Sequence, residues 1–136
     1  AQPIDVVVLS IGVNDVTSLM QPGAWVRWQS RLAQGILARH TPKLLIHSAV
    51  PPMHGFTALP QPLRWFMGQW AREMNRRLEH SLNGETRRFF RWPVHGVVSD
   101  GLASDGFHPG PLGYAAWATG LRGMIAERKF EPSGLP

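Results

Sequence analysis

The sequence of 136 residues contains no cysteine, which excludes disulfides and thiolate metal sites. No apolar run reaches the length of a membrane-spanning helix, and no secretory leader is visible at the start. Acidic residues are few, since nine Asp and Glu stand against fourteen Lys and Arg. The hydrophobic fraction of 43% and the charged fraction of 17% are typical of a globular core. We expect one domain over residues 1–136, with residues 131–136 as a tail.

The basic balance, a formal net charge of +5, comes mostly from arginine. Two groups of arginines stand out: Arg72, Arg76 and Arg77, then Arg87, Arg88 and Arg91. A basic patch is one feature of nucleic-acid-binding proteins. However, Glu73 and Glu79 accompany the first group on a predicted helix, which is typical of a solvated face. No stacking-aromatic RNA motif or helix-turn-helix spacing is present, so we predict no nucleic-acid partner.

Two aliphatic runs predict parallel strands. Residues 4–11 (IDVVVLSI) and 43–50 (KLLIHSAV) lack strict alternation, which is the pattern of strands buried on both faces. Between them, residues 25–40 repeat apolar side chains at helical spacing, and Pro42 prevents continuation. The order strand, helix, strand implies a right-handed crossover and parallel pairing.

The remaining residues predict two more helices and one short strand. A proline-rich loop at 51–62 precedes a helix that ends near Asn83-Gly84. Residues 88–92 form a candidate third strand, and a long loop at 93–110 leads into a last amphipathic helix. The fold class is therefore α/β, a three-layer α/β/α sandwich with a parallel sheet.

Two polar clusters fall on loops that the fold brings to one rim of the sheet. Gly12-Val13-Asn14-Asp15 follows the first strand, and Asp105-Gly106-Phe107-His108-Pro109 precedes the last helix. Sites in open α/β sheets are built at the carboxyl ends of the strands. The imidazole of His108 can take up and return a proton near neutral pH. The carboxylate of Asp105 can accept from the ring Nδ1–H and fix the tautomer.

These paired blocks resemble the Gly-x-Asn-Asp and Asp-x-x-His blocks of the SGNH, or GDSL, hydrolases. Members of that family are serine esterases, lipases, thioesterases and carbohydrate acetyl-esterases with a flavodoxin-like fold. The resemblance implies that His108 is the general base and Asp105 its orienting acid. It also implies that Asn14 donates to the oxyanion, that Gly12 allows close approach, and that no cofactor or metal takes part. For Asp15 we expect a structural role near the site, because a carboxylate would repel an oxyanion.

The nucleophile block of that family, Gly-Asp-Ser, is absent from the sequence. The resemblance therefore implies that the chain is the C-terminal part of a hydrolase domain. The missing N-terminal segment would supply the nucleophile and the neighbours of a central first strand. Ser10 and Ser48 fall in predicted strands, and Ser99 and Ser104 in the loop of His108. We expect none of them to be the nucleophile, and we expect the chain alone to be inactive.

Two other classes of function are compatible with the same residues. One is a non-catalytic binding module, because a fold does not guarantee chemistry. The other is a metal-dependent hydrolase, although no histidine pair has the i, i+4 spacing of a metalloprotease. Its ligands would come from His47, His54, His95, Asp105 and His108. The expected substrate of the hydrolase is a small-molecule or lipid ester, and the candidate acyl-pocket residues are Met53, Phe56, Leu59, Trp65 and Phe66.

Overall fold

The structure is a computed structural model that describes residues 3–93 and 101–128. The predicted tail at 131–136, together with His95 and Ser99, lies outside the described residues. The elements in chain order are β1 (Val6–Leu9), α1 (Val13–Thr17), α2 (Pro22–His40), β2 (Leu44–Ser48), η1 (Met53–Gly55), α3 (Leu63–Ser81), β3 (Arg87–Phe90) and α4 (Pro111–Glu127).

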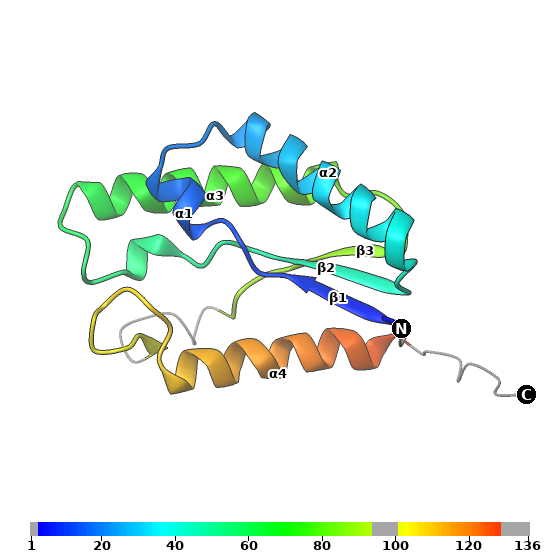
Figure 1. Cartoon of the computed structure of the whole chain (residues 1–136). Helices are drawn as coiled ribbons and strands as arrows, with labels where there is room; N and C mark the ends of the chain where they lie inside the picture. Colours follow the sequence, from blue (N-terminus) through cyan, green and yellow to red (C-terminus); the bar gives the residue numbers. More distant parts are fainter. Residues whose placement is uncertain (1–2, 94–100, 129–136) are drawn as a thin grey trace, which may run out of the picture.

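The three strands form one parallel sheet in the order β1-β2-β3. Helices α2 and α3 cover one face of this sheet, and α4 covers the other (Figure 1). The predicted three-layer α/β/α arrangement with a parallel sheet is thus confirmed. Figure 1 also shows α1, η1 and the loop before α4 at the end of the sheet where the strands point.

Burial differs between the two strands that the sequence predicts to be buried on both faces. All five residues of β2 are buried, because it is the central strand and has helices above and below. The four residues of β1 are only half-buried. Within the described part of the chain, β1 lies at an edge of the sheet and pairs with β2 alone. The expectation of burial on both faces therefore holds for β2. For β1 that expectation included the neighbours that a missing N-terminal segment would supply, and the edge position of β1 agrees with a chain that lacks them.

Side chains alternate across β2 and divide the core into two parts. Leu44 and Ile46 pack with Leu121 of α4 on one face. His47 points to the other face and contacts α2 through Gln29. The larger core, on that second face, is rich in methionine and aromatic side chains.

Several element boundaries differ from those predicted. Helix α2 begins at Pro22, because proline at the first helical position loses no hydrogen bond. Strand β3 covers Arg87–Phe90 rather than residues 88–92. The short helix α1 replaces a predicted turn. In residues 3–93 and 101–128, no helix has both the length and the apolar character needed to cross a membrane.

Candidate active site

The loop before α4 is a hairpin-like segment held by its own backbone. Ala103 N–H donates to His108 O at 2.8 Å, and Gly110 N–H donates to Gly101 O at 2.7 Å. Gly106 has a φ of +67°, and a Cβ there would lie 2.4 Å from Thr57 Oγ1. Glycine is therefore required at this position both for its backbone conformation and for space. The contact anchors the loop against the segment that follows η1.

Within this loop, Asp105 and His108 form a close pair. His108 Nδ1 lies 2.6 Å from Asp105 Oδ2, and Asp105 Oδ1 accepts from the backbone N–H groups of Phe107 and His108, each at 3.0 Å. The bond from His108, followed by the two backbone bonds, lowers the pKa of Asp105 to about 2. Asp105 is therefore ionised at neutral pH and favours the tautomer with a proton on Nδ1. The other ring nitrogen, Nε2, is then the one left to exchange protons.

The ring of Phe107 supports this pair from the core. It packs edge-on against Phe56, with centroids 5.0 Å apart, and also against the imidazole of His108 at 5.3 Å. Phe56 is buried. Aromatic pairs of this geometry are favourable beyond their buried area. The exposed imidazole of His108 thus packs against Phe107, which in turn packs against the buried ring of Phe56.

The second polar cluster begins where β1 ends. Gly12 precedes α1 with a φ of +136°, and a Cβ there would lie 2.5 Å from Val50 Cγ2 and 3.0 Å from an atom of Trp25. Asp15 Oδ2 accepts from Trp25 Nε1 at 3.1 Å, which ties α1 to α2. Asn14 is exposed in the first turn of α1, and its carboxamide has no hydrogen-bond partner among the described residues.

Both clusters line one cavity of about 590 Å³, a size typical of small-molecule sites. Asp105 is not among its lining residues and reaches the cavity through His108. The structure therefore brings together at one cavity residues that lie about 95 positions apart in the sequence. The polar lining residues are Ser10, Asn14, Asp15, His108 and Tyr114.

Among the candidate serines that the structure describes, Ser48 and Ser104 lie where the sequence places them and Ser10 does not. Strand β1 ends at Leu9, so Ser10 is outside the strand; it is exposed and lines the cavity. The placement of Ser10 within a buried strand was wrong. Ser48 is buried at the end of β2, and its Oγ accepts from Trp117 Nε1 at 3.0 Å. Ser104 is exposed and does not line the cavity.

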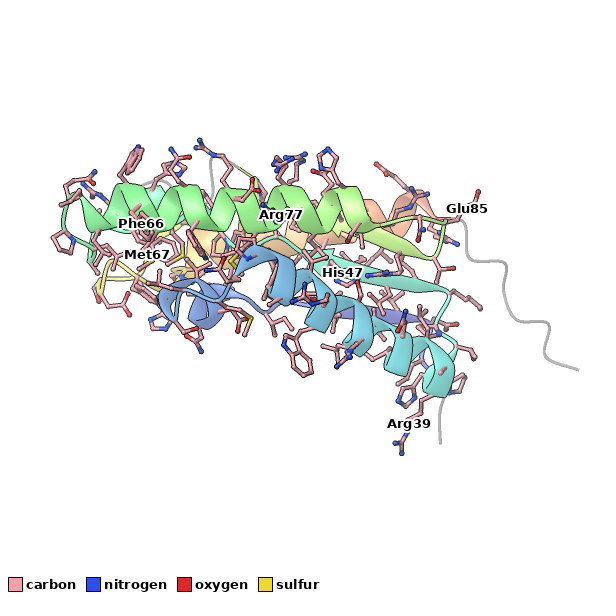
Figure 2. All side chains as sticks on the ribbon, turned by 90° about the horizontal axis from the view of Figure 1, so that it is seen from above. Arg39, His47, Phe66, Met67, Arg77 and Glu85 are labelled. Atoms are coloured by element: carbon pink, nitrogen blue, oxygen red, sulfur yellow. The ribbon has the colours of Figure 1, made fainter. Side chains whose placement is uncertain are left out.

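The five candidate acyl-pocket residues separate in the structure. Phe56 lines the cavity, whereas Met53 is buried in the larger core. Trp65 and Phe66 are exposed on α3, and Figure 2 shows Phe66 and Met67 near the start of that helix. Leu59 packs against the larger core.

Two tryptophans outside the predicted site also line the cavity. Trp92 and Trp117 stack with centroids 6.0 Å apart. Trp92 follows β3 and Trp117 lies on α4, so their meeting depends on the tertiary fold. No local pattern in the sequence signals it, because neither side chain belongs to a recognisable motif.

His47, one of the candidate metal ligands, is held by protein groups. Its Nδ1 lies 3.3 Å from Gln29 Oε1, and its Nε2 accepts from Arg87 Nη2 at 3.1 Å. Burial, and then the charge of Arg87, lowers the pKa of His47 to about 4. Figure 2 shows His47 between α2 and α3. In the part of the chain that the structure describes, no three His, Asp or Glu side chains gather as a metal site requires.

The fold and the cavity define a class: a three-layer α/β protein with its candidate site at the carboxyl end of a parallel sheet. The family model of the GDSL-like Lipase/Acylhydrolase family matches residues 1–116. The chain belongs to this family, which makes it a hydrolase of the lipase/acylhydrolase type. No curated protein and no solved structure matches the sequence.

Proposed function

We propose that this chain carries the base, the orienting acid and an oxyanion donor of a serine ester hydrolase. The observation that supports it is the single cavity lined by both Asn14 and His108, with His108 Nδ1 held by Asp105. An acyl hydrolase needs such a base near the attacking nucleophile and such a donor near the oxygen of the same carbonyl group. The substrates are acyl esters, thioesters or carbohydrate acetyl esters.

In the proposed reaction, His108 Nε2 removes the proton from a serine hydroxyl as the oxygen attacks the ester carbonyl. Asp105 keeps the proton on Nδ1 and stabilises the imidazolium that forms. The Asn14 carboxamide donates an N–H to the developing oxyanion, a contact worth roughly 3–4 kcal/mol in sites of this kind. His108 then returns the proton to the leaving alcohol, and water repeats the sequence to release the acid.

We propose that the nucleophile is a serine outside these 136 residues, because they contain no Gly-Asp-Ser block. Ser10 is the competing assignment, since it lines the same cavity as His108. Asp15 has a structural role in this proposal, because its carboxylate already accepts from Trp25. Gly12 allows the loop to lie against Val50.

Covalent labelling separates these assignments. The 136-residue chain alone should neither react with a fluorophosphonate serine probe nor hydrolyse p-nitrophenyl butyrate. A longer chain that adds a Gly-Asp-Ser segment should do both, and a chelator should not inhibit it. Stoichiometric labelling of the short chain at Ser10 would reassign the nucleophile. A longer chain that binds an ester without turnover would instead support the binding module.

A further inference from the structure

Residues 48–50, at the end of β2, receive hydrogen bonds from three different parts of the fold. Trp117 Nε1 donates to Ser48 Oγ at 3.0 Å, and Trp92 Nε1 donates to Ala49 O at 2.8 Å. Asn75 of α3 forms hydrogen bonds with the backbone of Val50. Ala49 and Val50 form part of the wall of the candidate active-site cavity. This wall is therefore fixed by side chains from α4, α3 and the segment after β3.

Asn75 forms two hydrogen bonds with the backbone of Val50. Its Oδ1 accepts from Val50 N–H at 2.8 Å, and its Nδ2 donates to Val50 O at 2.8 Å. One carboxamide thus satisfies both the N–H and the C=O of Val50, which lies outside β2 and, among the described residues, has no partner strand at that point to bond them. Two bonds from one planar group fix the orientation of the peptide as well as its position. Asn75 does not itself line the active-site cavity.

Val50 transmits this restraint to the loop that carries the candidate oxyanion donor. A Cβ at Gly12 would lie 2.5 Å from Val50 Cγ2, so the valine side chain lies directly against the Gly12 backbone. Gly12 O in turn accepts from Val16 N–H at 3.0 Å, which closes the first turn of α1. That turn carries Asn14. A shift of Val50 would therefore move the Gly12 backbone and the turn behind it.

We propose that Asn75 is a positioning residue of the hydrolase site, acting through Val50 and Gly12 to hold Asn14 where the oxyanion forms. The proposal rests on the function proposed above and adds to it a residue on a different helix. Donors in an oxyanion hole stabilise the transition state only when they are preorganised, and a displacement of about 1 Å can cost about 10²-fold in rate. Loss of the Asn75 contact should thus lower kcat rather than raise KM.

The test is a double-mutant cycle in the full-length protein that carries these residues, with p-nitrophenyl butyrate as substrate. Asn75→Ala should lower kcat at least 10-fold and change KM less than twofold. In an Asn14→Ala background the same change should lower kcat less than twofold, because the donor that it positions is already gone. The matched control is Leu78→Val, a buried position farther along α3. Leu78→Val should lower Tm about as much as Asn75→Ala does, while its kcat stays within twofold of the wild-type value. Equal losses of kcat from Asn75→Ala in both backgrounds, or no loss at all, would overturn the proposal.

Hydrogen exchange keeps the positioning role testable apart from the proposed function. If the full-length protein hydrolyses no ester, the proposed function fails, and exchange at the Val16 amide becomes the readout. We expect Asn75→Ala to accelerate that exchange at least 10-fold relative to Leu78→Val. Equal exchange rates in the two variants would show that Asn75 does not hold the loop.

Discussion

The buried histidine on β2 allows a prediction about the pH dependence of stability. His47 is 1% exposed, with its Nε2 facing the Arg87 guanidinium and its Nδ1 facing Gln29. Protonation of this imidazole would place two cations about one hydrogen-bond length apart in a buried layer. Burial and the charge of Arg87 therefore lower the pKa of His47 from 6.5 to about 4. The folded state keeps the ring neutral over a range in which the unfolded chain binds a proton.

The sign and the size of the effect follow from this difference. Well above pH 6.5 both states hold the ring neutral, and the stability that depends on its neutrality is fully present. As the pH falls below 6.5, the unfolded state gains a proton that the folded state gains only near pH 4. Each pH unit in this window lowers the free energy of unfolding by up to about 1.4 kcal/mol. Between pH 7.5 and 5 the loss should reach about 2 kcal/mol.

The two carboxylates with strongly lowered pKa values affect stability at lower pH than His47 does. The pKa values of Asp105 and Glu73 are both lowered to about 2, Glu73 mainly by its hydrogen bonds from Arg76 and Arg77. Stability that depends on these two ionised groups is lost only as the pH falls below their unfolded values near 4. These two carboxylates therefore contribute little to the change in stability measured above pH 5.

The assay is urea unfolding at several pH values from 7.5 to 5, monitored by circular dichroism. The free energy of unfolding of the wild-type protein should fall by about 2 kcal/mol more than that of His47→Gln over this range. Glutamine keeps a polar side chain next to Arg87 but does not titrate. His40→Gln, at an exposed position at the end of α2, serves as the control and should keep the wild-type dependence. Identical pH profiles for the wild type and His47→Gln would refute the reasoning.

Three substitutions test the loops around the cavity. Gly12→Ala should destabilise the protein by about 3 kcal/mol or more in denaturant unfolding, because the φ of +136° at Gly12 and its contact with Val50 both exclude a Cβ. A loss of stability below about 1 kcal/mol would contradict this prediction. Gly106→Ala should reduce ester hydrolysis, because a Cβ would displace the loop from Thr57, and wild-type activity would count against that anchoring role. Asn14→Ala should lower kcat by about 10²–10³ with little change in KM, whereas an effect on KM alone would assign Asn14 to substrate binding.

The fold could be predicted from local patterns wherever those patterns were strong. The helical spacing of apolar side chains located α2, α3 and α4, and the run 43–50 located the central strand. The short helix α1 could not be predicted, because five residues are too few to show a helical period. The number of strands that flank β1 could not be read from its own residues, because an apolar run shows that a strand exists but not how many neighbours it has.

The candidate site was predictable only in its local part. A spacing of three residues is enough to bring Asp105 next to His108, so the sequence already contained that pair. The contacts of Asn75 and Trp92 with residues 49–50 join positions 25 and 43 residues apart. Such contacts depend on the packing of whole elements, which no single stretch of the sequence specifies. The same applies to the pairing of His47 with Arg87 across two strands.

The central claim is that His108, oriented by Asp105, is the base of an ester hydrolase. Its most direct test is the rate of p-nitrophenyl butyrate hydrolysis by the full-length protein and by its His108→Ala variant. We expect kcat/KM to fall by about 10³-fold or more while the circular dichroism spectrum stays unchanged. Asp105→Asn should lose less, because the base remains and only its orientation suffers. Near-normal hydrolysis by a folded His108→Ala variant would contradict the account.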